Sequence, residues 1–130
     1  MAVILYADDL LSEDRTRNGY ERMVERVGHK LITAANGQEA LEILCEETID
    51  LVYLDVSMPV MGGPAVLREL KSRGLQIPVV MCSAEPEHEV RRYVQDSGYE
   101  YVIGICDLLE ADNIAKHLSE PAPTILSSDD

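Results

Sequence analysis

Near its middle the chain reads Leu51-Val52-Tyr53-Leu54-Asp55, an unbroken apolar run that ends in an aspartate. A short apolar run without polar alternation is typical of a strand that is buried on both faces, as in a parallel sheet. Four further runs of this kind lie along the chain: Val3–Ala7, Leu31–Ala34, Val79–Cys82 and Tyr101–Ile105. Together with Leu51–Leu54 they predict five buried strands.

Helical patterns fill the gaps between these strands. From Tyr20 to Val27, apolar residues recur at positions i, i+3, i+4 and i+7, and Gly28 is a natural end for this helix. Asn36 and Glu39 form a variant capping box at the start of the next helix. Three more helices are expected, one from Pro64 to Gly74, one from Pro86 to Gly98, and one capped by Asp107 and Glu110 that carries Ile114, Ala115 and Leu118.

Alternating strands and helices within 130 residues predict one α/β domain. With right-handed crossovers, the compact arrangement is a doubly wound five-stranded parallel sheet of order 2-1-3-4-5, which is a flavodoxin-like fold. We expect the domain to span residues 1–119. Residues 120–130 are expected to form a flexible tail, because the chain is small and polar from Pro121 onward.

Composition narrows the classes of partner. The formal net charge is -13, which disfavours nucleic acid and anionic membranes as direct partners. No apolar run approaches the roughly 18 residues of a membrane span, and the N-terminus lacks the features of a signal peptide, so we expect a cytoplasmic protein. Cys45, Cys82 and Cys106 are widely spaced, which argues against a disulfide framework or a zinc site and predicts three buried thiols in a reducing compartment.

Carboxylates mark the expected ligand site of this fold. Such sheets bind ligands beyond the carboxyl ends of the first and third strands. The first strand is followed by Asp8 and Asp9 and the third ends in Asp55, so three carboxylates should converge there. Oxygen ligands suit Mg²⁺, and an aspartate can act as a nucleophile that forms an aspartyl phosphate. The simpler alternative is that Asp8 or Asp9 caps the first helix.

Ser83 ends the fourth strand, beside the third. Its hydroxyl is placed to hydrogen-bond a phosphoryl group on Asp55. A serine at a strand end is more often an ordinary turn residue, so this position alone is weak support.

Several segments resemble one family. Asp55-Val56-Ser57-Met58-Pro59-Val60-Met61-Gly62-Gly63 resembles the segment around the acceptor aspartate in receiver domains of two-component response regulators, which typically reads D-x-x-M-P-x-M-D-G. Leu5–Asp9 resembles the acidic pair after the first strand of these domains, Ala35–Leu41 their second-helix entry, and Ser83-Ala84 their hydroxyl-plus-small pair. The matches are in order from Val3 to about Leu118, so the chain is similar to a CheY-like receiver.

The resemblance implies roles for the site residues. Asp55 would accept phosphate from a phosphohistidine. Asp9 and Asp55 would bind Mg²⁺ directly, Asp8 would bind it through water, and the backbone carbonyl of Ser57 would be a further ligand. Ser83 would sense the phosphoryl group.

The resemblance also implies partners and a switch. Tyr101 lies at the aromatic switch position of the fifth strand, although an ordinary half-buried tyrosine is an equal alternative. The partners would be a histidine kinase or phosphotransfer protein and an output protein that binds the face of the fourth helix, fifth strand and fifth helix. The domain would catalyse at most its own phosphorylation and dephosphorylation.

Three features depart from the family pattern, and one of them is Gly62-Gly63, which replaces the usual aspartate-glycine after Met61. A lysine and a proline normally follow the aromatic residue of the fifth strand, but Gly104 and Ile105 stand there. The lysine would pair with the acceptor carboxylate and its phosphate. About three extra residues lie within Leu10–Gly19, where Arg15 or Arg17 could supply the missing charge, although a surface arginine is the simpler explanation.

Three functions are compatible with this pattern. The first is a stand-alone receiver in a phosphorelay, with output through protein binding. The second is a pseudo-receiver, an interaction module that does not depend on phosphate, and Gly104 favours it. The third is a phosphohydrolase with an aspartyl nucleophile, but the dehalogenase-type pattern requires an aspartate at Ser57.

Overall fold

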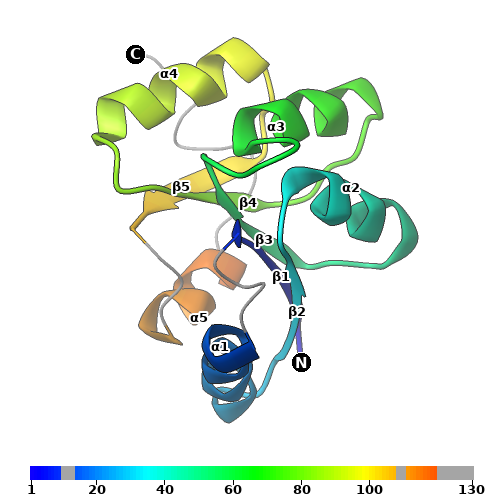
Figure 1. Cartoon of the computed structure of the whole chain (residues 1–130), viewed down its shortest axis with the longest axis vertical. Coiled ribbons are helices and arrows are strands. Elements are labelled where there is room, and N and C mark those ends of the chain that lie inside the picture. Colours follow the sequence, from blue (N-terminus) through cyan, green and yellow to red (C-terminus); the bar gives the residue numbers. More distant parts are fainter. Residues whose placement is uncertain (10–13, 108–110, 120–130) are drawn as a thin grey trace.

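The computed structural model describes residues 1–9, 14–107 and 111–119 of the chain. In this part of the chain five parallel strands form one sheet in the order β2-β1-β3-β4-β5, which confirms the predicted topology (Figure 1). The strands are β1 (Val3–Ala7), β2 (Lys30–Ala34), β3 (Leu51–Asp55), β4 (Val79–Cys82) and β5 (Val102–Cys106).

Helices cover both faces of the sheet. They are α1 (Asp14–Arg26), α2 (Gly37–Glu46), α3 (Gly63–Ser72), α4 (Glu87–Ser97) and α5 (Ala111–Ser119). Helices α1 and α5 lie on one face, and α2, α3 and α4 lie on the other (Figure 1). No helix of the described ranges is long and apolar enough to cross a membrane.

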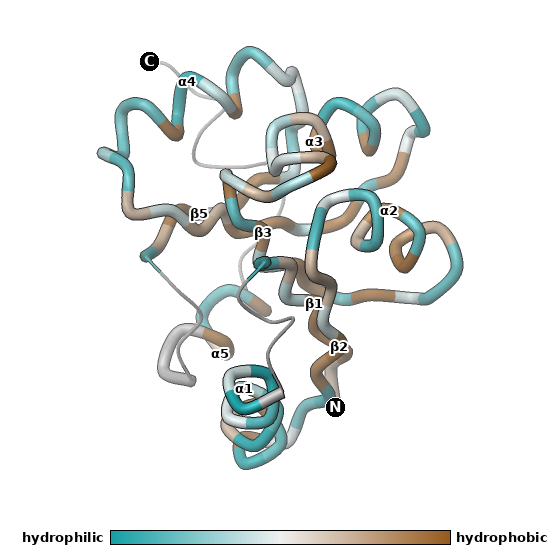
Figure 2. Tube along the Cα trace, viewed as in Figure 1, coloured by the Kyte–Doolittle hydropathy of each residue, from teal (hydrophilic) through white to brown (hydrophobic). Residues whose placement is uncertain are grey.

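Two hydrophobic cores sandwich the sheet. Leu5 and Leu54 belong to the core under α2–α4, whereas Tyr6 and Tyr53 belong to the core under α1 and α5. Successive residues of a strand point to opposite faces, so each strand contributes to both cores. This explains why the strands read as unbroken apolar runs, and in Figure 2 the apolar colour follows the strands while the outer helices carry the polar residues.

The ends of α2 and α4 form as the sequence predicts. Asn36 Oδ1 accepts a hydrogen bond from Glu39 N at 2.9 Å, and Glu39 Oε1 accepts one at 2.9 Å from Ala35 N, the residue before the N-cap, so the arrangement is a variant of the capping box. Gly98 ends α4 with a left-handed φ of 72°, a conformation that favours glycine.

Several boundaries and burial predictions were wrong. Helix α1 ends at Arg26, so Val27 lies beyond it and is 42% exposed. Ala115 is exposed on the outer side of α5. Cys45 is exposed on α2, whereas Cys82 is buried and Cys106 is half-buried. Glu110 and the expected tail, residues 120–130, lie outside the described residues.

Strand β5 is shifted relative to the predicted Tyr101–Ile105. It begins at Val102 and continues to Cys106. Val79 pairs with Val102, but the next residue, Val80, pairs with Gly104, so one extra residue is accommodated in β5. Such a bulge displaces the residues that follow by one position relative to the neighbouring strand.

We expect Asn36→Ala to lower the free energy of unfolding by about 1 kcal/mol, because Glu39 N would lose its capping partner. The substitution Gln38→Ala, at an exposed position of the same helix turn, should change it by less than about 0.5 kcal/mol. Urea denaturation of both variants measures the difference. Equal stabilities would show that the cap contributes nothing.

Candidate functional site

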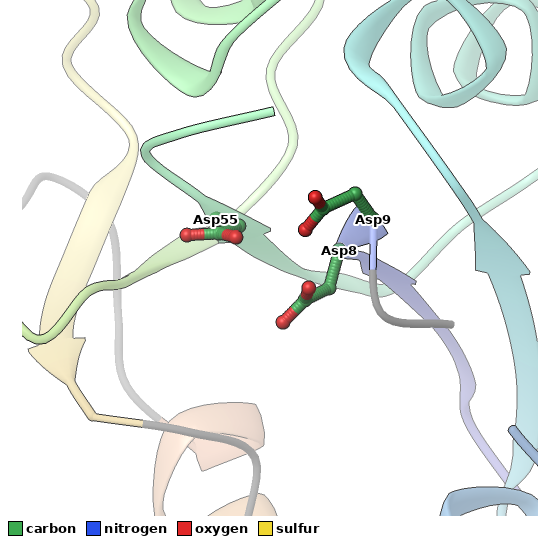
Figure 3. A group of neighbouring side chains, drawn as sticks. All are labelled: Asp8, Asp9 and Asp55. Carbon is green, nitrogen blue, oxygen red and sulfur yellow. The ribbon is translucent and has the colours of Figure 1, made fainter. Parts of the chain in front are cut away.

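Three carboxylates meet at one edge of the sheet. Strands β1 and β3 are neighbours, with Ala7 opposite Leu54, so the residues that follow these positions leave the sheet side by side. One carboxylate oxygen each from Asp8, Asp9 and Asp55 lies within 4.8 Å of the others. Figure 3 shows the three side chains gathered beyond the ends of β1 and β3. The structure therefore brings together the three aspartates that the sequence predicted to converge.

Crowding shifts the acidity of Asp55. Partial burial is the largest cause, followed by the negative charge of Asp8, and together with Asp9 they raise the pKa of Asp55 to about 6. Hydrogen bonds from the backbone N–H groups of Ser57 and Val56 oppose this rise. Ser57 N lies 3.4 Å from Asp55 Oδ1. A cation bound among the three carboxylates would relieve the repulsion, and carboxylate oxygens are the ligands that Mg²⁺ prefers, so the donor set fits this ion.

Asp8 is anchored by hydrogen bonds to β2 and to β1, the strand that precedes it. Its backbone N–H donates to the carbonyl of Ala34 on β2 at 3.0 Å. Its Oδ2 accepts a hydrogen bond from Tyr6 Oη at 3.4 Å. Burial raises the pKa of Tyr6, so this hydroxyl remains a donor. Asp9, in contrast, is exposed.

The loop after Asp55 depends on a glycine. Gly63 N donates to the carbonyl of Val56 at 3.0 Å, which folds the loop back on the end of β3. A Cβ atom at Gly63 would lie 2.5 Å from the carbonyl oxygen of Asp55, closer than a side chain permits. The glycine at the end of the Met58-Pro59 motif is therefore required by the close approach of two backbone segments.

Ser83 lies at the same edge as the carboxylates. It directly follows Cys82, the residue of β4 that pairs with Asp55. Ser83 N donates to the carbonyl of Cys106 at 3.1 Å, and Ser83 Oγ accepts from Glu85 N at 2.9 Å. The serine is thus both a turn residue and a neighbour of Asp55.

A connection from Ser83 to α4 was not foreseen from the sequence. Glu85, whose N–H bonds Ser83, accepts a hydrogen bond from Tyr93 Oη at 2.9 Å through its own carboxylate. Tyr93 lies on α4 and packs against the core under α2–α4. Glu85 and Tyr93 are eight residues apart, and no sequence pattern marks them as partners, because the loop before α4 decides their contact.

Residues 4–104 match the family model of the response regulator receiver domain. The chain belongs to this family. It is 35% identical over 83 residues to the transcriptional regulatory protein AfsQ1 of Streptomyces coelicolor, a match that covers 64% of the chain and 35% of that relative. The chain therefore spans only about a third of the length of this curated relative.

Solved structures show the same fold. The chemotaxis protein CheY4 of Vibrio cholerae is 25% identical, with a TM-score of 0.73 and coverage of 91% of this chain and 96% of that one. The response regulator TrrA of Thermotoga maritima, solved in complex with Mg²⁺ and BeF, is 24% identical, with a TM-score of 0.71 and coverage of 91% and 99%.

Tyr101 lies at the far end of the receiver sheet from Asp55. It precedes β5, and its carbonyl accepts a hydrogen bond from Val79 N at the start of β4. Its ring packs edge-on against Tyr99, with centroids 5.6 Å apart. Cys106 is five positions after Tyr101 in the chain, which is roughly 16 Å along a strand. The structure therefore does not bring Tyr101 to the edge that holds Ser83.

Gly104, the expected lysine position, does not lie level with Asp55 either. It pairs with Val80, whereas the residue level with Cys82 and thus with Asp55 is Cys106. The bulge in β5 accounts for one residue of this two-residue offset, because without it Gly104 would pair with Met81. A lysine on β5 that is level with the acceptor would occupy the position of Cys106. The two arginines proposed as substitutes lie on α1, where Arg15 is exposed and Arg17 is half-buried.

Gly104 instead makes room for a histidine. A Cβ atom at this position would lie 3.3 Å from His117 Nε2 on α5. On its other side, His117 Nδ1 lies 2.7 Å from Tyr53 Oη, and both residues are buried. Gly104 does not have a positive φ, so space rather than backbone conformation accounts for the glycine.

Replacing Asp55 by asparagine should stabilise the fold in metal-free buffer. The pKa of Asp55 in the folded protein, about 6, exceeds that of an aspartate in an unfolded chain, about 3.9. Ionised Asp55 therefore costs stability, and the cost grows as the pH rises from the unfolded to the folded value. With allowance for partial exposure, we expect Asp55→Asn to raise the free energy of unfolding by about 1–2 kcal/mol at neutral pH and to leave it unchanged below a pH of about 4.

Urea denaturation in EDTA across this pH range measures the effect. Asp96→Asn, at an exposed position on α4, controls for the change in net charge. If Asp55→Asn raised the free energy of unfolding no more than Asp96→Asn at neutral pH, ionised Asp55 would not destabilise the folded protein.

Gly104→Lys should destabilise the domain by roughly 2 kcal/mol or more, because a long charged side chain would enter a buried position against His117. Cys106→Lys should be better tolerated, because Cys106 is half-buried at the end of β5, and it should lower the pKa of Asp55. Chemical denaturation and NMR titration of the Asp55 carboxyl test the pair. If Gly104→Lys is fully stable and shifts the pKa of Asp55 more than Cys106→Lys does, then Cys106 is not the β5 residue that is level with Asp55.

Proposed function

We propose that this receiver domain accepts a phosphoryl group on Asp55 from a phosphohistidine of a histidine kinase or phosphotransfer protein, in a reaction that needs Mg²⁺. The observation that supports this proposal is the group of Asp8, Asp9 and Asp55, whose oxygens lie within 4.8 Å of one another at the ends of β1 and β3. The match of residues 4–104 to the receiver family makes a phosphorelay role the natural use of such a group.

Asp9 and Asp55 would hold Mg²⁺ directly, Asp8 through water, and the Ser57 carbonyl would complete the protein ligands. When bound, the ion neutralises negative charge on the incoming phosphoryl oxygens. A carboxylate oxygen of Asp55 is the nucleophile, so the residue must be ionised, and a pKa of about 6 leaves it mostly ionised at neutral pH.

Ser83 would bind the transferred group. Its Oγ accepts a hydrogen bond from Glu85 N, and a hydroxyl that accepts can still donate its own proton. That proton can bond a phosphoryl oxygen on Asp55, which ends the strand beside β4. Any movement of Ser83 would act on Glu85 and, through the carboxylate of Glu85, on Tyr93 of α4.

The signal would be transmitted to a partner that binds the face formed by α4, β5 and α5. Glu85 and Tyr93 connect the site to α4, and Tyr53 and His117 connect β3 to α5. The receiver would signal through contacts of this face with an output protein or with another part of a longer chain. It would act as a signalling domain, with no turnover beyond its own phosphorylation and dephosphorylation.

A second candidate function is phosphate-independent binding. It is favoured by β5, which from Val102 to Cys106 contains no lysine to pair with a phosphorylated Asp55. In this case the fold and the output face would be retained, and Asp55 would carry no signal.

Treatment with a small-molecule phosphodonor and Mg²⁺ should add one phosphoryl group to the wild-type protein. Intact-mass spectrometry should show the adduct, and Asp55→Asn should lack it because the nucleophile is gone. Ser83→Ala should retain acceptance at a rate reduced by roughly tenfold or more, as expected when one charge-assisted hydrogen bond is lost. Chelation of the metal should abolish the adduct.

The controls separate the two candidate functions. Asp96→Asn, on α4, should be phosphorylated like the wild type. An undiminished adduct in Asp55→Asn would reject Asp55 as acceptor. No adduct in the folded wild type, together with Mg²⁺ affinity unaltered by Asp9→Ala, would favour the phosphate-independent module.

A further inference from the structure

Two thiols face each other next to the carboxylate site. Cys82 is the last residue of β4 and Cys106 is the last residue of β5, and the two pair directly in the sheet. Their Sγ atoms lie 3.7 Å apart. Both side chains belong to the core under α1 and α5, so they point to the same face. The proposed phosphoryl chemistry uses neither of them.

The backbone geometry suits a bond between these sulfurs. Neighbouring strands lie about 4.8 Å apart, within the range of about 4.4–6.8 Å that disulfides span between Cα atoms. Disulfide formation requires the two sulfurs to close from 3.7 Å to about 2.05 Å.

The two thiols differ in access. Cys106 is half-buried, at the point where β5 meets the exposed Asp107, whereas Cys82 is 2% exposed. A reagent from solvent therefore meets Cys106 first. The thiols lie beside the carboxylates of Asp8 and Asp55, whose negative charge disfavours an anionic reagent, so a small neutral oxidant suits this place. Hydrogen peroxide meets both requirements.

We propose that Cys106 and Cys82 form a peroxide-sensitive thiol pair that closes into a disulfide between β4 and β5. The Cys106 sulfur attacks one peroxide oxygen, an S–O bond forms, the O–O bond breaks, and the second oxygen leaves as water with the thiol proton. The Cys82 sulfur then attacks the Cys106 sulfur, the S–S bond forms, and the sulfenic oxygen leaves as water with the Cys82 proton. Two electrons pass from the thiols to the peroxide, and two waters form.

The bond would tie together the strand ends beside the acceptor. Cys82 pairs with Asp55 and precedes Ser83, whose N–H already bonds the Cys106 carbonyl. Closure would restrain this part of the site without altering any carboxylate. The third thiol, Cys45, lies on α2, on the opposite face of the sheet, and its Sγ contacts Arg73 Nη1 at 3.1 Å. It cannot join the pair within one molecule.

Thiol counting tests the pair without any phosphodonor. A Cys45→Ser protein would be treated with hydrogen peroxide under native conditions, then denatured and alkylated, and its intact mass measured. We expect the monomer to lose the mass of two hydrogen atoms and to take up no alkylating reagent. Dithiothreitol should restore both reactive thiols. In Cys45→Ser with Cys106→Ser, the loss of two hydrogens should disappear.

Two results would overturn the proposal. One is that both thiols of the folded Cys45→Ser protein remain alkylatable after peroxide treatment. The other is that oxidation yields only dimers linked between molecules, or only oxygen adducts on Cys106. The first measurement leaves Cys82 and Cys106 unchanged, so it does not depend on a variant of the pair being folded.

Discussion

Burial of β3 on both faces is the constraint on which the rest of this receiver depends. Leu51, Val52, Tyr53 and Leu54 are fully buried, and they feed two cores that lie on opposite sides of the sheet. Asp55 is the last residue of β3 and lies at the edge of these cores, where its side chain is half-buried. Its partial burial is the largest cause of its raised pKa, so the same packing that holds the sheet together also tunes the proposed nucleophile.

The edge of the sheet gathers groups that have no close relation in sequence. Asp8 and Asp9 follow β1, Asp55 ends β3, and Ser83 follows β4. Because all strands are parallel, their carboxyl ends lie at the same edge of the sheet, and the polar residues that follow neighbouring strands therefore form one site. The extra hydrogen bonds from Ser83 through Glu85 to Tyr93 extend this place toward α4.

The bulge in β5 changes the side of the site where the family normally carries a lysine. It moves Gly104 one residue further from the level of Asp55 and brings Cys106, in place of Ile105, to that level. The space that Gly104 leaves is used by His117, which reaches Tyr53 on β3. In place of a lysine on β5, this receiver has a buried Tyr53–His117 pair between the sheet and α5 and two thiols beside the carboxylates.

The sequence by itself determined the α/β class, the strand order, the convergence of Asp8, Asp9 and Asp55 and the capping of α2 by Asn36. These features depend on local patterns, since unbroken apolar runs require two-sided burial and the order of a doubly wound sheet fixes which strand ends meet. Only the tertiary structure decided the level of Gly104 against β4, the place of Tyr101 and the pairing of Cys82 with Cys106. One extra residue in a strand leaves the apolar pattern of the sequence intact. A bulge is defined only by the pairing with the neighbouring strand, so the sequence pattern does not reveal it.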